Sequence, residues 1–195
     1  MSQLRQISKA IRSTVALWLI TAFIYPLFML AFGQIALPFQ ANGSLLTKND
    51  MIIGSALIGQ PFTSDRYFWS RPSTVDYSTK SEVATTGTSG ASNLAPSNLD
   101  LLKRIQDKVL RLNQAKIQPT ADLVYTSASG LDPHISTVAA QAQIQRIATA
   151  RNIDPNKIKS LIQQNTDGRF LGIFGEPGVN VLKLNMALDA LQSNR

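Results

Sequence analysis

The sequence of 195 residues contains no cysteine and only one histidine, His134. Without cysteine the chain can form no disulfide framework, no thiol nucleophile and no zinc finger or ribbon. A single histidine excludes a metal site built from several imidazoles. The 12 acidic residues are dispersed and show no EF-hand spacing. We therefore predict that the chain has no metal site.

Negative charge is missing from the first quarter of the chain, where no acidic residue precedes Asp50. The net charge is +7, and Arg5, Lys9, Arg12 and Lys48 supply more than half of it. The rest of the chain is therefore only mildly basic. A nucleic-acid-binding domain gathers basic residues on one face or stripe. We expect no nucleic-acid partner.

A long uncharged stretch separates the first basic residues from the rest of the chain. Within it, residues 15–37 form an apolar run that would span roughly 35 Å as a helix, at about 1.5 Å per residue. The hydrocarbon core of a bilayer is about 30 Å thick, so we predict one transmembrane helix here. Pro26 lacks an N–H group and should kink this helix, which suggests packing against partner helices.

A cleaved secretory signal, and with it a freely secreted binding protein, is the alternative. The run is longer than the roughly 7–15 apolar residues of a signal, and no small-x-small cleavage site follows it. We therefore favour an uncleaved anchor. Three basic residues before the run, against one after it, predict a cytoplasmic N-terminus at residues 1–14. The prediction continues with a linker at 38–50 and one extracytoplasmic domain at 51–195.

This outer domain shows helical and strand patterns without a regular alternation, which favours the α+β class. We expect strands within 51–57, 123–127, 170–174 and 179–184. Helices should begin after caps at Ser97 or Asn98, and at Ser136, Asp154 and Asn185. Residues 78–92 are rich in Ser, Thr and Gly and read as a loop.

Two short segments resemble catalytic motifs. Residues 54–61 have the glycine spacing of a phosphate-binding loop, but Gln60 and Pro61 stand where Lys and Ser or Thr are needed. Ser127, Ser129 and His134 lie close in sequence, which leaves a membrane-anchored extracytoplasmic hydrolase as the alternative function. Closeness in sequence does not provide triad geometry, and G-x-S-x-G is absent. We predict no catalytic residue and interpret the segment as a turn in which Asp132 caps the backbone.

Two other groups are candidates for binding. Tyr67, Trp69 and Arg71 belong to an aromatic and cationic cluster that suits a protein interface or, alternatively, a core strand with flanking arginines. Gln143 and Arg146 share one face of a predicted helix, which is either solvated or a polar docking surface. We add Asp132 and His134 to the interface candidates, next to Pro26.

Taken in order behind the anchor, a series of motifs covers essentially the whole chain and resembles the C subunit of the Kdp potassium-transporting ATPase. They are G-S-x-L-I-G-Q-x-F (54–62), Y-F-W-x-R-P-S (67–73), S-G-x-S-N-L-x-P (89–96), D-L-V (122–124), S-G-L-D-P-H-I-S (129–136), Q-x-x-R-I-A (143–148) and G-R-x-L-G-x-x-G-E-x-x-V-N-V-L-x-L-N-x-A-L-D (168–189). The residues after D-L-V and the stretch 74–88 depart from the family pattern.

The resemblance implies a bacterial plasma-membrane complex for high-affinity potassium uptake. In that family a channel-like A subunit conducts the ion, a P-type ATPase B subunit hydrolyses ATP, and a small F subunit accompanies them. The C subunit is implied to be non-catalytic, to stabilise assembly, and to act as a catalytic chaperone that raises the ATP affinity of the B subunit. No cofactor is then expected on this chain alone. ATP is expected only together with the ATPase subunit, and Gln143 and Arg146 are the candidate contacts.

Overall fold

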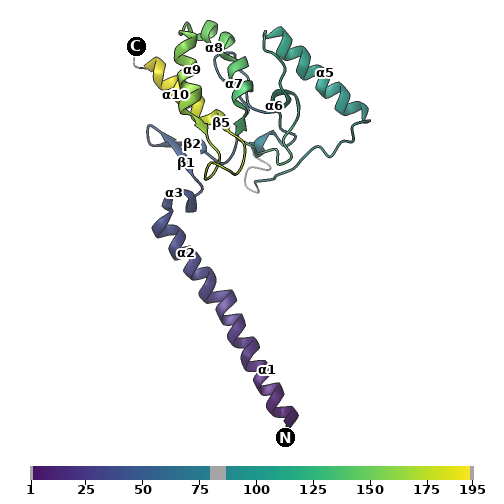
Figure 1. Cartoon of the computed structure of the whole chain (residues 1–195), viewed down its shortest axis with the longest axis vertical. Coiled ribbons are helices and arrows are strands. Elements are labelled where there is room, and N and C mark those ends of the chain that lie inside the picture. Colours follow the sequence, from purple (N-terminus) through teal and green to yellow (C-terminus); the bar gives the residue numbers. More distant parts are fainter. Residues whose placement is uncertain (1, 80–86, 194–195) are drawn as a thin grey trace. The chain divides into compact units, whose positions relative to one another are not determined.

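The computed structural model describes residues 2–79 and 87–193 (Figure 1). The chain divides into two compact units, Met1–Leu45 and Leu46–Arg195. Part of the predicted 78–92 loop, residues 80–86, lies outside the described residues.

The first unit is a nearly continuous helix. It consists of α1 (Ser2–Leu19), a π-helical turn η1 (Ile20–Ile24) and α2 (Tyr25–Ala36), followed by the short helix α3 (Pro38–Ala41). Its stretch Gln3–Ala36 is long and apolar enough to cross a membrane, and its side chains are exposed. Helical structure thus begins well before residue 15, because residues 2–14 belong to the same helix as the predicted span.

The expected irregularity at Pro26 takes the form of a π-helical turn. Pro26 has no N–H to donate to the preceding turn. Directly before it, the N–H of Tyr25 donates to the carbonyl of Ile20, five residues back. A π-helical turn is one of the ways in which a helix accommodates such a break.

The second unit begins with a β-hairpin that occupies part of the predicted linker. Strands β1 (Leu45–Lys48) and β2 (Met51–Ser55) are joined by Asn49 and Asp50. Both residues have positive φ, 51° and 60°, as a two-residue hairpin turn of this kind requires. Helix α3 and strand β1 thus lie within the predicted linker 38–50, and the boundary between the two compact units, after Leu45, falls there too.

In the described part of this unit, a three-stranded antiparallel sheet and six helices follow the hairpin (Figure 1). The strand order is β3 (His134–Ile135), β5 (Gly178–Asn180), β4 (Thr166–Asp167), and Ile135 and Thr166 both pair with Val179. The helices are α5 (Leu99–Gln114), α6 (Ala121–Val124), α7 (Thr137–Ala142), α8 (Ile144–Arg151), α9 (Pro155–Gln164) and α10 (Val181–Ser193). A short 3₁₀ turn, η2 (Asp76–Ser78), precedes them. The predicted α+β class is confirmed.

Three of the four predicted helix caps are confirmed. The side chains of Asn98, Ser136 and Asp154 each accept a hydrogen bond from a backbone N–H of the first helical turn. The fourth is wrong, because α10 begins at Val181 and the side chain of Asn180 accepts from the N–H of Lys183. Asn180 is both the last residue of β5 and the cap of α10, so the strand predicted at 179–184 ends early.

Two predicted strands are absent from the described structure. Residues 121–124 form helix α6 instead of opening a strand at 123–127. Residues 170–174 form a tight turn closed by an isolated bridge between Phe170 and Phe174. Apolar content indicated a strand in both cases, but the run of apolar residues is too short to distinguish strand from turn or helix.

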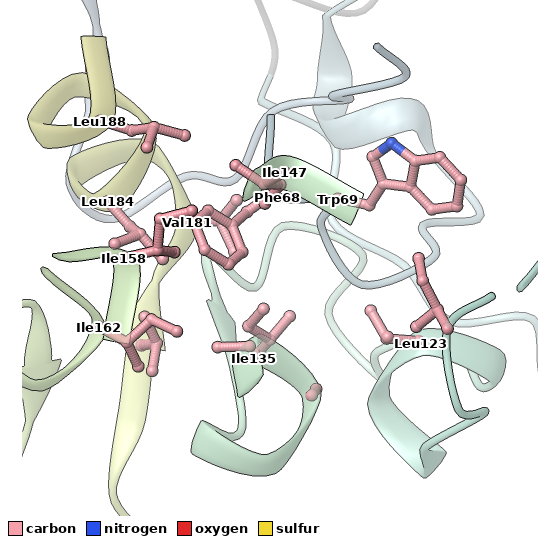
Figure 2. Packing of buried hydrophobic residues seen from close by; sticks show 14 of the residues in the cluster. Phe68, Trp69, Leu123, Ile135, Ile147, Ile158, Ile162, Val181, Leu184 and Leu188 are labelled. Atoms are coloured by element: carbon pink, nitrogen blue, oxygen red, sulfur yellow. The ribbon is translucent and has the colours of Figure 1, made fainter. Parts of the chain in front are cut away.

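The hydrophobic core lies between the helices and the segment that contains Phe68 and Trp69. Figure 2 shows the Phe68 ring among side chains of α8, α9 and α10, while the Trp69 indole lies on the side of Leu123. Fully or almost fully buried members are Phe68, Ile135, Ile147, Ile158, Ile162, Val181, Leu184 and Leu188. Because Phe68 has no exposed surface, the 67–71 segment is the centre around which the helices pack.

Candidate functional site

Two side-chain amides hold the backbone of the Phe68–Trp69 segment, which has no regular secondary structure. The Asn185 side chain accepts from the Phe68 N–H (2.8 Å) and donates to the Phe68 carbonyl (3.1 Å). Gln143 does the same for Trp69, at 2.8 Å and 3.2 Å. We call these two side chains the amide clamp. They satisfy buried peptide groups that would otherwise need a neighbouring strand.

The Gln143 side chain has no hydrogen-bonding capacity left. Its oxygen accepts from Trp69 and from Nη2 of Arg146 (2.8 Å), and its nitrogen donates to the carbonyls of Trp69 and Ala139. A primary amide has two donor hydrogens and two acceptor positions, so all four are used. Gln143 is also completely buried. The interpretation of a solvated or docking face is wrong for this residue.

Arg146 belongs to the same structural network. Its guanidinium donates to the carbonyls of Asp65 (2.5 Å) and Tyr67 (2.8 Å) and lies 4.3 Å from the centre of the Trp69 ring. Only 7% of its side chain is exposed. Burial lowers the pKa of Arg146 to about 10, which still leaves it charged at neutral pH. Gln143 lies between α7 and α8 and Arg146 lies in α8, and their side chains contact each other.

The Trp69 ring also contacts a second guanidinium. Arg111 of α5 lies 4.1 Å from the ring centre. Cation–π contacts of this kind contribute about 0.5–2 kcal/mol each. Trp69 is 8% exposed, and its indole N–H donates to the Ser64 carbonyl (3.1 Å). Beside it is an open groove of about 440 Å³, which Asp65, Trp69, Arg111, Lys116 and Arg146 line with three neighbouring residues.

Tyr67 belongs to a polar cluster centred on Asp189. The Tyr67 hydroxyl (3.2 Å), Nη2 of Arg151 (2.8 Å) and Nζ of Lys48 (3.5 Å) all contact the Asp189 carboxylate. Burial alone would raise the pKa of Asp189, but the hydrogen bond and charge of Arg151 outweigh it and the pKa is lowered. Neither Tyr67 nor Trp69 lies in a strand, so the core-strand interpretation is right about burial and wrong about secondary structure.

Arg71, Asp132 and His134 form a half-exposed polar cluster. Arg71 pairs with Asp132 at 3.3 Å, and the Asp132 carboxylate accepts from the His134 N–H at 3.0 Å, as predicted for a capped turn. The His134 ring contacts Asp167 on β4 at 3.2 Å and Asp132 at 3.7 Å. Hydrogen bonding to Asp132 is the main cause of a raised His134 pKa, opposed by burial and assisted by Asp167.

The His134 side chain reaches Asp167 across the middle strand of the sheet. Gly178 of β5 pairs with Asp167, and a Cβ placed on Gly178 would lie 3.3 Å from the Cβ of His134. The absence of a side chain at Gly178 therefore allows the imidazole to pass over β5. No local pattern indicated that Asp167 takes part, since it lies 33 residues from His134 along the chain.

The serines predicted for the alternative hydrolase do not contact His134 in the described structure. Ser127 and Ser129 contact each other at 3.2 Å, and each also accepts from a nearby backbone N–H. The imidazole is occupied by Asp132 and Asp167. A serine nucleophile needs a hydrogen bond to its general base, so this arrangement is not a hydrolase triad.

The glycine-rich segment 54–61 is likewise structural. The Gln60 side chain turns back and donates to the Ile53 carbonyl at 2.7 Å. A Cβ on Gly54 would lie 2.4 Å from that amide nitrogen and 2.8 Å from Leu182. The ends of the Gln60 and Leu182 side chains thus pack closely against Gly54, and the segment is folded on itself, in agreement with the rejection of a phosphate-binding loop.

The described residues include no group of His, Asp or Glu side chains that could hold a metal ion. The polar networks around Phe68, Trp69 and His134 instead connect distant parts of the chain. The molecule thus combines a candidate membrane helix with an α+β domain in which polar side chains hold distant segments together. That combination is the architecture of a candidate single-span membrane protein.

The comparisons with known proteins identify the family. The family described as KdpC: K+-transporting ATPase, c chain matches residues 7–190, so the chain belongs to it. A Nostoc sp. protein named potassium-transporting ATPase KdpC subunit 1 is 61% identical, with 98% of this chain and 99% of the relative covered. The Synechocystis sp. KdpC subunit is 60% identical over 92% of this chain and 95% of the relative. A Burkholderia cenocepacia KdpC subunit is 45% identical, over 92% and 93%.

The predicted family is therefore confirmed, and with it a role as an accessory subunit of a potassium-transporting ATPase. Sequence reasoning missed the site roles of Asn185, which it expected only as a helix cap, and of Arg151 and Asp167. These side chains contact Phe68, Tyr67 and His134, respectively. Asn185 lies in α10 and Arg151 in α8. In each case a polar side chain within an apolar stretch of helix was the signal that could have indicated a buried polar contact.

Proposed function

We propose that this chain stabilises the assembly of a potassium-import complex in the bacterial plasma membrane and has no catalytic step of its own. Its helix packs among helices of the partner subunits, and its domain docks outside on the channel-like A subunit. The B subunit hydrolyses ATP, and the small F subunit completes the complex. The near full-length family match carries this proposal.

The charge distribution supports this orientation. Arg5, Lys9 and Arg12 precede the apolar segment and Lys48 follows it, which favours a cytoplasmic N-terminus. The outer domain is then separated from cytoplasmic ATP by the bilayer. Pro26 lies on the helix, whose side chains are exposed in the isolated chain and therefore available to partner helices.

We also propose that any effect on the ATP affinity of the B subunit is indirect. Gln143 is buried and fully hydrogen-bonded, so a nucleotide could contact it only after the amide clamp opened. A coupling free energy transmitted through the partner subunits needs no such opening. This chain then binds no cofactor alone, and ATP is present only on the ATPase subunit.

The test is purification of the complex from membranes in mild detergent. The proposal expects this chain to co-purify with the larger channel and ATPase chains, and expects potassium-dependent ATPase activity to fall when the chain is deleted. Recovery of the chain only as a free monomer would contradict it. His134→Ala should leave the chemistry of ATP hydrolysis intact, and complete loss of activity in an assembled complex would revive a catalytic role.

A further inference from the structure

A turn of four large apolar residues projects from the outer domain between β4 and β5. Phe170, Leu171, Ile173 and Phe174 are exposed by 72%, 75%, 73% and 62%. Every residue from 167 to 177 is exposed, so none of these side chains contributes to the core. We call residues 170–174 the apolar turn.

The backbone of the apolar turn is held in one conformation. Phe170 and Phe174 exchange both backbone hydrogen bonds, at 2.8 Å and 3.0 Å, and the N–H of Gly172 donates to the Arg169 carbonyl at 3.0 Å. Leu171 and Gly172 have positive φ, 53° and 74°. A leucine in this conformation is uncommon and costs free energy. The apolar side chains are thus displayed by a closed turn rather than by a loose loop.

The size of this surface matches the largest apolar patch that a typical soluble monomer exposes, and such patches are often functional. A phenylalanine offers about 150–250 Å² for burial, so the four residues together expose about 400–600 Å² of apolar surface. Contiguous patches on soluble monomers reach about 300–600 Å² at most and are often functional. One side of a standard protein interface buries about 800 Å². The apolar turn could therefore fill most of the centre of one interface.

The charges beside the apolar turn indicate what covers it. The ionised residues of 168–178 are Arg169 and Glu176, and they pair with each other at 3.3 Å. A loop that docks on lipid headgroups usually carries a cluster of Lys or Arg around its apolar tip. The Arg169–Glu176 pair instead leaves the foot of the apolar turn with no net charge, which suits contact with the uncharged, apolar surface of a protein.

We propose that the apolar turn inserts into an apolar, uncharged pocket on another subunit of the potassium-transporting ATPase complex and anchors the outer domain there. This inference rests on the proposed function, which supplies the partner subunit. To that function it adds which part of the domain makes the contact, namely the apolar turn.

The test uses the complete complex with a photoreactive benzophenone amino acid at position 171. A crosslink between this chain and a larger subunit supports the proposal. A crosslink between two copies of this chain, or labelling of lipid alone, overturns it. Because the side chain at 171 is exposed and makes no described contact, this variant probes the surface without depending on the core.

Substitution provides the second arm. The double variant Phe170→Ser, Phe174→Ser should lower the amount of this chain that co-purifies with the complex at least tenfold. The double variant Leu99→Ser, Leu110→Ser removes two leucines that are 78% and 59% exposed on α5, and should leave recovery unchanged. Full recovery of the first variant overturns the role of the apolar turn, whereas failure of the unaltered chain to co-purify overturns the proposed function itself.

Discussion

Replacing Gln143 with leucine removes the half of the amide clamp that holds Trp69. The leucine fills a similar volume but offers no hydrogen bonds, so the N–H and carbonyl of Trp69 lose their partners in a buried site. Each buried polar group left unpaired costs about 1–3 kcal/mol. Arg146 also loses its 2.8 Å contact with the Gln143 oxygen.

The two Trp69 groups alone give an expected loss of about 2–6 kcal/mol in the free energy of unfolding. Whole domains are stable by about 5–15 kcal/mol, so the loss is a large fraction of the total. For a domain of this size about 1 kcal/mol shifts the unfolding temperature by roughly 2–4 °C, which predicts a decrease of about 5–20 °C. Asn185→Leu should give a similar decrease, because Asn185 holds Phe68 in the same way.

The assay is thermal unfolding of the full chain in detergent, followed by near-ultraviolet circular dichroism of Trp69 and its surroundings. Gln141→Leu is the matched control, because Gln141 is exposed on α7 and should change stability by less than about 0.5 kcal/mol. If Gln143→Leu unfolds at the temperature of the unaltered chain, the hydrogen bonds of Gln143 to Trp69 do not contribute the expected stability. Unchanged stability with a weakened ATP affinity of the assembled complex would instead assign Gln143 to nucleotide binding.

Two further predictions concern the sheet and the turn before it. The raised pKa of His134 means that folding favours its protonated form. This stabilisation is therefore complete below the unfolded pKa of about 6.5 and is lost as the pH rises through the folded pKa. Measurements of the free energy of unfolding from pH 5 to 9 should show that loss, and His134→Asn should abolish the pH dependence. Gly130→Ala should destabilise the domain by more than about 1 kcal/mol, because Gly130 has a φ of 68° and its Cβ would lie 2.7 Å from the Gly90 carbonyl; Gly168→Ala, where nothing lies within 4 Å, is the control and should be nearly neutral in chemical denaturation.

Local signals in the sequence predicted a substantial part of this fold. Asn98, Ser136 and Asp154 cap their helices because each precedes a helical apolar pattern with a side chain suited to the first turn. The apolar run was sufficient to predict the candidate membrane helix. Such signals act within a few residues, so the sequence alone suffices to detect them.

The errors arose where distant residues decide the structure. Asn185 follows an apolar run and resembles a cap, but it is occupied by Phe68, which lies 117 residues earlier in the chain. Gln143 was assigned to a surface because amides are usually solvated, and its burial depends on Trp69, 74 residues away. The turn at 170–174 has strand-like composition, but its apolar side chains have no neighbours to pack against within the domain.

In the candidate site, too, contacts between neighbours in the sequence could be predicted and contacts between distant residues could not. Asp132 and His134 lie two residues apart, and the sequence predicted a turn in which Asp132 caps the backbone, which the hydrogen bond from the His134 N–H fulfils. Asp167 joins them only because the sheet places β4 on the other side of Gly178. The serine, aspartate and histidine side chains of residues 127–134 lie close together in the sequence, as in a candidate triad. In the structure they form two separate hydrogen-bonded groups: the two serines contact each other, and His134 contacts Asp132.

We propose that a single helix anchors the chain and leaves its α+β domain outside the cell membrane. Because the chain has no cysteine, one introduced thiol reports its own position. Gln3→Cys and Gln118→Cys place it at exposed positions in the helix and in the domain, respectively. In intact spheroplasts, a membrane-impermeant maleimide should label Gln118→Cys at once and Gln3→Cys only after permeabilisation. The reverse pattern would place the domain in the cytoplasm and contradict the account.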